Sequence, residues 1–173
     1  MRASTAAGIM LIWAAVFSSC APTRIWTSVP GSAVARNEQF TVRFTPSRTG
    51  TTAFNRFELE IANTGSRPLE VDWIKTRYLY QNRPAGGFIF EGLDETNVNS
   101  PPPDVLPPGA ELRKSIAPLR FIAWKGYKPG YRDLGSFSAG PLPQGPNGIL
   151  LVVRQADRIF EEKLSVSINI ETH

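Results

Sequence analysis

Basic and aromatic side chains are interleaved in one segment of the chain, residues 113–133. Aromatic rings offer flat surfaces for stacking and cationic groups attract anions, a combination used on nucleic acids, glycans and anionic lipids. The segment therefore predicts a binding surface. Its candidate residues are Arg120, Trp124, Lys125, Tyr127, Lys128, Tyr131 and Arg132. The alternative is that the rings pack together as the small core of a long loop, covered by lysine and arginine stems.

Histidine and cysteine, which serve many nucleophilic and metal-assisted reactions, each occur once, as His173 and Cys20. This excludes Ser-His-Asp and Cys-His sites and histidine-rich zinc sites. Adjacent carboxylates occur at Asp94-Glu95 and Glu161-Glu162, but neighbours on a strand point to opposite faces, so neither pair converges on a substrate. The sequence predicts a protein that is not an enzyme and has no cofactor. A carboxylate-based hydrolase is the alternative.

Oxygen-bearing side chains gather in the segment 91–99, and calcium prefers such ligands. They are Glu91, Asp94, Glu95, Asn97 and Asn99. Their spacing lacks the Asp-x-Asp-x-Asp-Gly order of a known calcium loop. A plain polar loop is therefore the prediction, with no metal site, and calcium binding is the alternative.

The N-terminus has the features of an export signal. A positive start at Met1-Arg2 precedes the apolar run 6–17, which is too short for a mature transmembrane helix. Small residues then lead to Cys20. The stretch 17–20 resembles the lipobox of bacterial lipoproteins, in which the cysteine is acylated, commonly with palmitate, and becomes the new N-terminus. A plain secretory signal is the alternative, although it leaves an unpaired thiol unexplained.

The resemblance to a lipobox implies a location. It makes residues 1–19 the signal peptide and Cys20 the lipidated residue. Ala21 stands where an aspartate would mark retention in the inner membrane, so the implied place is the periplasmic face of the outer membrane. The predicted partners are the membrane, through the lipid anchor, and an envelope protein, peptidoglycan or anionic lipid. Because the protein is expected to be exported, nucleic acid is not a predicted partner.

Residue periodicity predicts one all-β domain. At 173 residues the chain is long enough for one core, and its 15 prolines and 14 glycines suit short strands. Residues 20–36 lack a clean period and predict a lipid anchor and tether. Residues 37–173 predict an immunoglobulin-like antiparallel β-sandwich of about seven strands, with a long loop at 118–148.

The stretch 57–73 is the expected centre of this sandwich. Apolar residues alternate with acidic ones on both sides of the turn at Asn63–Ser66, which predicts two strands joined as a hairpin. Beyond Trp73 the alternation changes parity, so a bulge or bend is expected near Trp73-Ile74. Further strands are expected at 39–44, 86–90, 111–116, 149–153 and 164–170.

Part of this pattern resembles the water-stress and hypersensitive-response domain of type-2 late-embryogenesis-abundant proteins. The resemblance rests on Asn63, Pro68-Leu69-x-Val71, Tyr78-x-Tyr80, Gly86 or Gly87, and Pro107-Pro108-Gly109. It implies a fibronectin-III-like sandwich with a protective or structural role. Gly65, Arg67-Pro68 and Pro108-Gly109 also resemble small sandwich lipoproteins of type VI secretion.

Together these patterns predict a non-enzymatic, lipid-anchored envelope module that binds or scaffolds another envelope component. A desiccation or stress-protection lipoprotein of the water-stress type and a small sandwich lipoprotein of a secretion system are the alternatives.

Overall fold

The computed structural model describes residues 24–93, 96–124 and 137–172, and for Trp124 only the backbone. These residues form β-strands and one 3-10 turn. The elements are β1 (Arg24–Val29), β2 (Ala33–Arg36), β3 (Phe40–Ser47), β4 (Arg56–Asn63), β5 (Leu69–Val71), β6 (Arg77–Tyr80), β7 (Arg83–Pro84), β8 (Phe88–Phe90), β9 (Asp104–Leu106), β10 (Glu111–Pro118), η1 (Leu119–Phe121), β11 (Ile122–Trp124), β12 (Phe137–Ala139), β13 (Gly145–Gln155) and β14 (Arg158–Thr172). No helix in these ranges is long and apolar enough to cross a membrane.

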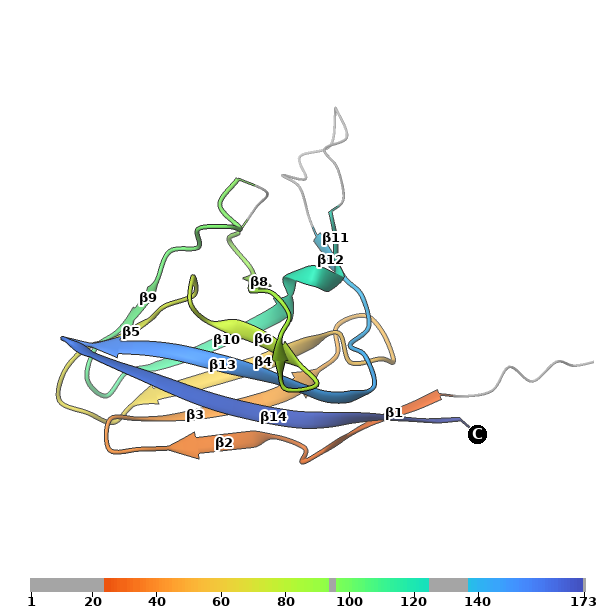
Figure 1. Cartoon of the computed structure of the whole chain (residues 1–173), viewed down its shortest axis with the longest axis horizontal. Coiled ribbons are helices and arrows are strands. Elements are labelled where there is room, and N and C mark those ends of the chain that lie inside the picture. Colours follow the sequence, from red (N-terminus) through yellow and green to blue (C-terminus); the bar gives the residue numbers. More distant parts are fainter. Residues whose placement is uncertain (1–23, 94–95, 125–136, 173) are drawn as a thin grey trace, which may run out of the picture.

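Two antiparallel sheets form the layers of a sandwich (Figure 1). The seven-stranded sheet has the order β1-β14-β13-β5-β9, with β6 pairing β13 and β7 pairing β6. The five-stranded sheet has the order β2-β3-β4-β10-β8, and β11 pairs β12 in a separate small sheet. The predicted all-β sandwich is confirmed. The strands outnumber the predicted seven because several are only two to four residues long.

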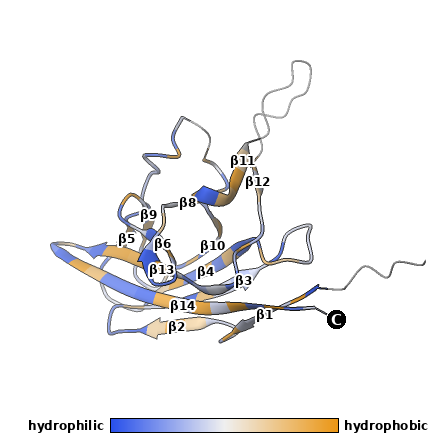
Figure 2. Ribbon diagram, turned by 45° about the vertical axis from the view of Figure 1, so that its right-hand side comes forward, coloured by the Kyte–Doolittle hydropathy of each residue, from blue (hydrophilic) through white to orange (hydrophobic). Residues whose placement is uncertain are grey.

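Alternating side chains of both sheets fill the space between the layers. Along β14 hydrophilic and hydrophobic residues alternate (Figure 2), and the apolar set is buried. Phe44 stacks on Phe57 within the five-stranded sheet at 4.2 Å between ring centroids, and Phe57 meets Tyr78 of the opposite sheet at 6.5 Å. The strand at 149–153 lies, as predicted, in the middle of a sheet, between β14 and β5 with β6.

The predicted hairpin at 57–73 is wrong, although both of its strands exist. β4 pairs with β3 and β10 in one sheet, whereas β5 pairs with β13 and β9 in the other. The chain therefore crosses between the layers. The buried Asn63 side chain holds this crossing, because its amide donates to the carbonyls of Arg67 and Leu106 at 2.9 Å and its oxygen accepts from the Gly65 N–H.

The predicted bend at Trp73-Ile74 is confirmed. Both β5 and β6 pair with β13, and the segment between them turns out of the ladder. The Asp72 N–H donates to the carbonyl of Val152, and the Val152 N–H donates to the Thr76 hydroxyl, so the turn interrupts the sheet without leaving these groups unpaired. Ile74, which lies in this turn, is 51% exposed.

The predicted tether at 20–36 is wrong over the residues that the structure describes. β1 pairs with β14 from Arg24 onward, and β2 pairs with β3, so this segment adds one strand to each layer. The two strands are separated by a cis Val29–Pro30 bond and Gly31, where the chain changes sheets. The folded domain therefore includes residues 24–36, which the prediction had assigned to the tether.

Candidate functional site

Most of the predicted binding surface lies outside the described residues. Lys125, Tyr127, Lys128, Tyr131 and Arg132 fall in the range 125–136, and Cys20 lies in the range 1–23. Asp94 and Glu95 of the calcium alternative are also outside. Arg120 is exposed on η1, and the backbone of Trp124 ends β11, so the two described members sit where the chain leaves the sandwich.

Two contacts between an arginine and a phenylalanine ring lie at the small sheet β11–β12. Arg120 lies over the ring of Phe121 at 5.1 Å, and Arg56 of β4 lies over Phe137 of β12 at 5.1 Å. Phe121 also meets the ring of buried Tyr78 edge-on at 6.0 Å. These two described rings thus pack toward the core while Arg120 remains exposed, which favours the loop-core alternative for the rings and solvent access for this cation.

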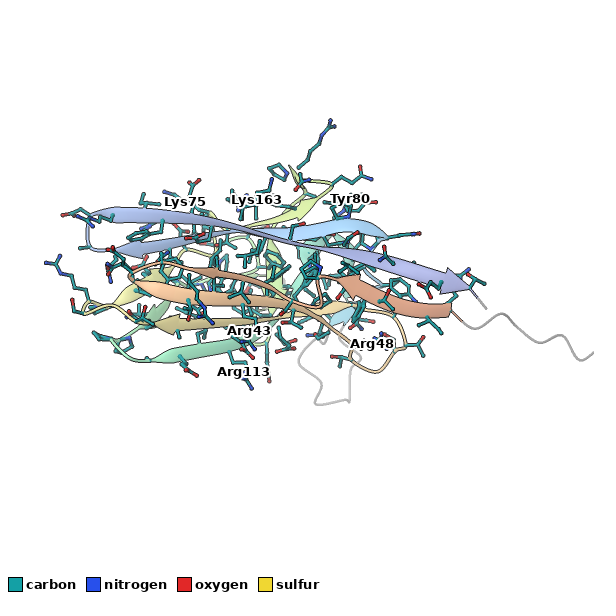
Figure 3. The ribbon with its side chains drawn as sticks, turned by 90° about the horizontal axis from the view of Figure 1, so that it is seen from below. Arg43, Arg48, Lys75, Tyr80, Arg113 and Lys163 are labelled. Atoms are coloured by element: carbon teal, nitrogen blue, oxygen red, sulfur yellow. The ribbon has the colours of Figure 1, made fainter. Side chains whose placement is uncertain are left out.

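The outer face of the five-stranded sheet carries a hollow of about 490 Å³ that the sequence analysis did not find. Its rim is charged: Arg113 contacts Glu60 at 2.9 Å and Arg43 approaches the same carboxylate at 4.0 Å (Figure 3). Small Ala62 forms part of its floor. Period-two alternation in the sequence indicates that a strand has a polar outer face. It does not indicate which strands lie side by side to form the hollow. Two of its arginines are paired with Glu60 on the outer face of the sheet, so the hollow fits a solvated sheet face.

Lys114, counted among the basic residues of segment 113–133, points inward. It contacts Asp104 at 2.5 Å and lies over the ring of Phe90 at 4.0 Å, and Asp104 also accepts from the Trp73 indole at 2.7 Å. Phe90 and Asp104 belong to the edge strands β8 and β9 of opposite sheets. We call these four residues the edge clasp, because they join the two sheets at their open side.

Tyr78 is a titratable group in the centre of the described core. Its ring is fully buried, and burial raises the pKa of its phenol well above the usual range, with the nearby positive charge of Arg120 acting in the opposite direction. Its hydroxyl donates to the side-chain oxygen of Asn147, whose amide donates to the carbonyls of Pro143 and Gly145. The network is satisfied internally and holds the start of β13, so it is structural.

Two carboxylates, Glu162 and Asp72, accept hydrogen bonds from neighbouring side chains. Glu162 accepts from the Asn37 amide at 2.9 Å, and its neighbour Glu161 points to the outer face. Buried Asp72 accepts from Arg154. Within 24–93, 96–124 and 137–172, no three His, Cys, Asp or Glu side chains gather closely enough to hold a metal ion.

Comparisons with models of known protein families, with curated proteins and with solved structures found no match to the chain. The resemblances to lipoproteins, to the water-stress domain and to secretion lipoproteins therefore stay predictions. What the structure defines is the class of fold, an all-β antiparallel sandwich.

Proposed function

We propose that this protein is a non-enzymatic, lipid-anchored module of the bacterial cell envelope, held by Cys20 at the periplasmic face of the outer membrane, that binds another envelope component. The observation that carries the binding role is the β11–β12 sheet, which lies outside both layers of the sandwich (Figure 1). Long connections that leave a compact core are more often functional than structural, because they add chain entropy cost without adding much core burial.

The chemistry of this connection favours an anionic partner. Arg120 is exposed at its base, and the sequence adds Lys125, Lys128 and Arg132 along its length. Peptidoglycan, an anionic lipid or an acidic protein surface offers the matching charge. The chain as a whole carries a net charge of +4, which also favours such partners.

Capture from detergent-solubilised envelope, and from purified peptidoglycan, tests this function. The lipidated protein is compared with the variant Lys125→Ala/Lys128→Ala/Arg132→Ala. The control variant Arg36→Ala/Arg43→Ala/Arg113→Ala removes the same charge around the hollow of the five-stranded sheet. The proposal expects the parent and the control to capture the same component and the first variant to lose it. Equal capture by all three, or by none, contradicts it.

Stress protection without a defined binding site is the second candidate function. The packing of the Phe121 and Phe137 rings against the core favours it, because those rings are then unavailable for stacking on a ligand. The residues shared with the water-stress domain also have structural work: Asn63 holds the crossing between the sheets, and its carbonyl accepts from the Gly109 N–H. This candidate becomes the better one if the capture experiment fails.

A further inference from the structure

The distance between the anchor and the fold sets how the domain meets the membrane. β1 begins at Arg24, four residues after Cys20. Four residues span at most about 14 Å even when fully extended. If Cys20 is acylated, as the proposed function requires, it lies in the headgroup layer. Arg24 therefore cannot lie more than this short distance from the lipid surface, whatever the conformation of the residues between.

A basic surface surrounds this point of entry. Arg48 is exposed on the connection between β3 and β4, and its guanidinium donates to the carbonyl of Trp26 at 2.5 Å, which places it beside β1 (Figure 3). Arg24 begins β1 and is exposed, and Ile25 next to it is 44% exposed. We define these three residues, Arg24, Ile25 and Arg48, as the entry surface.

The charges favour this end over the broad faces. Glu171, opposite Ile25 in the β1–β14 ladder, partly offsets the two arginines. On the outer faces of the two sheets some arginines are paired instead, Arg113 with Glu60 at 2.9 Å and Arg154 with Glu70 at 3.6 Å. A surface with paired charges gains little from an anionic bilayer, whereas each unpaired cation near one gains appreciably.

We propose that the entry surface docks on the anionic lipid headgroups beside the anchor, so that the sandwich stands with its long axis away from the membrane. The β13–β14 hairpin lies at the opposite end (Figure 1). Because β14 has 15 residues, this hairpin then lies about 50 Å from the entry surface. Docking of this kind presents the far end to components of the periplasm.

Site-specific quenching tests the docked orientation. A fluorophore is attached to Thr51→Cys, exposed in the connection beside Arg48, or to Asp157→Cys, exposed at the far hairpin. The full-length gene is expressed, and the protein purified from membranes is placed in vesicles of phosphatidylcholine with phosphatidylglycerol that contain a headgroup nitroxide lipid. We expect strong quenching at Thr51→Cys and little at Asp157→Cys, with less quenching at Thr51→Cys in high salt or in phosphatidylcholine alone.

Charge variants show whether the quenching comes from docking of the entry surface or only from the short connection between Cys20 and Arg24. Arg24→Gln/Arg48→Gln should lower the ratio of docked to undocked protein about thirty-fold on the anionic vesicles. Arg67→Gln/Arg158→Gln removes the same charge from exposed residues at the far end and should leave the quenching unchanged.

Two outcomes overturn the proposal in different ways. Mass spectrometry of the N-terminal peptide shows whether Cys20 is acylated, and an unmodified cysteine overturns both the anchor and the docking. An acylated Cys20 with equal quenching at the two labels, or with equal effects of the two charge variants, overturns the docking alone and leaves the proposed anchor standing.

Discussion

The edge clasp makes a quantitative prediction about what closes the open side of the sandwich. Lys114→Met keeps most of the aliphatic stem and removes the charge. The substitution removes a charge-assisted hydrogen bond to Asp104, worth about 1.5–3 kcal/mol, and a contact with the Phe90 ring worth about 0.5–2 kcal/mol. Because burying the lysine charge also costs free energy, we expect a net loss of about 2 kcal/mol.

The neighbouring residue on the same strand supplies a matched control. Arg113 also contacts a carboxylate, Glu60 at 2.9 Å, but its side chain is 74% exposed, whereas that of Lys114 is 20% exposed. A solvent-exposed ion pair contributes about 0–1 kcal/mol. Arg113→Met should therefore lower the free energy of unfolding by less than about 0.5 kcal/mol, although it removes the same formal charge from the adjacent position of β10.

Urea denaturation of the parent and both variants measures the difference directly. The expected loss for Lys114→Met corresponds to a fall in Tm of about 4–8 °C for a domain of this size. The double variant Lys114→Met/Asp104→Asn should be destabilised by less than the sum of the single changes, because both remove the same contact. Equal losses for Lys114→Met and Arg113→Met, or a strictly additive double variant, would refute the clasp.

Further predictions concern three residues, the buried Tyr78 and Asn63 and the turn residue Ala156. Tyr78→Phe leaves the Asn147 oxygen buried without its donor, so we expect a loss of about 1–3 kcal/mol in the free energy of unfolding, measured by chemical denaturation. Because burial raises the pKa of Tyr78, the folded state holds its phenol proton more tightly than the unfolded state; its contribution is complete below about pH 10 and declines above it. A pH series of denaturation curves should show this decline in the parent and a weaker one in Tyr78→Phe, and identical declines would contradict it. Asn63→Ala frees two carbonyls and one N–H at the crossing between the sheets and should cost about 2–4 kcal/mol, while Asn99→Ala, the same change at an exposed position, serves as the control for side-chain loss alone. Ala156 has φ 52° at the β13–β14 turn, so Ala156→Gly should stabilise the domain by up to about 1 kcal/mol, and a loss of stability would contradict this.

Period-two alternation predicted which residues face the core, because burial of one face leaves a local mark on the sequence. Phe40, Leu59, Ile116 and Val166 are all buried where alternation placed them. The same rule missed β1 and β2. Val29 and Val34 face solvent at 63% and 47%, and the inward side chains of β2 are the small Ala33 and Ala35, so the strands show no readable apolar face. Pairing of β1 with β14 and of β2 with β3 holds these strands in place. The identity of a pairing partner cannot be recognised from the local sequence of a strand.

The sequence predicted which face of a strand is buried, but not which strands pair with each other. The candidate sites depend on this pairing. The turn after Asn63 suits a hairpin by its residue types, yet β4 pairs with β3 and β10 in one sheet and the short β5 pairs with β13 and β9 in the other. The same parity that buries Ile116 sends Lys114 inward, where only the meeting of β8 and β9 makes an inward lysine tolerable. Lys114, a basic residue of segment 113–133, therefore has a structural role. Arg48, which is far away in sequence, lies beside β1 instead. A surface inferred from one segment alone is incomplete for this reason, and contacts between distant strands decide which cations remain free to bind.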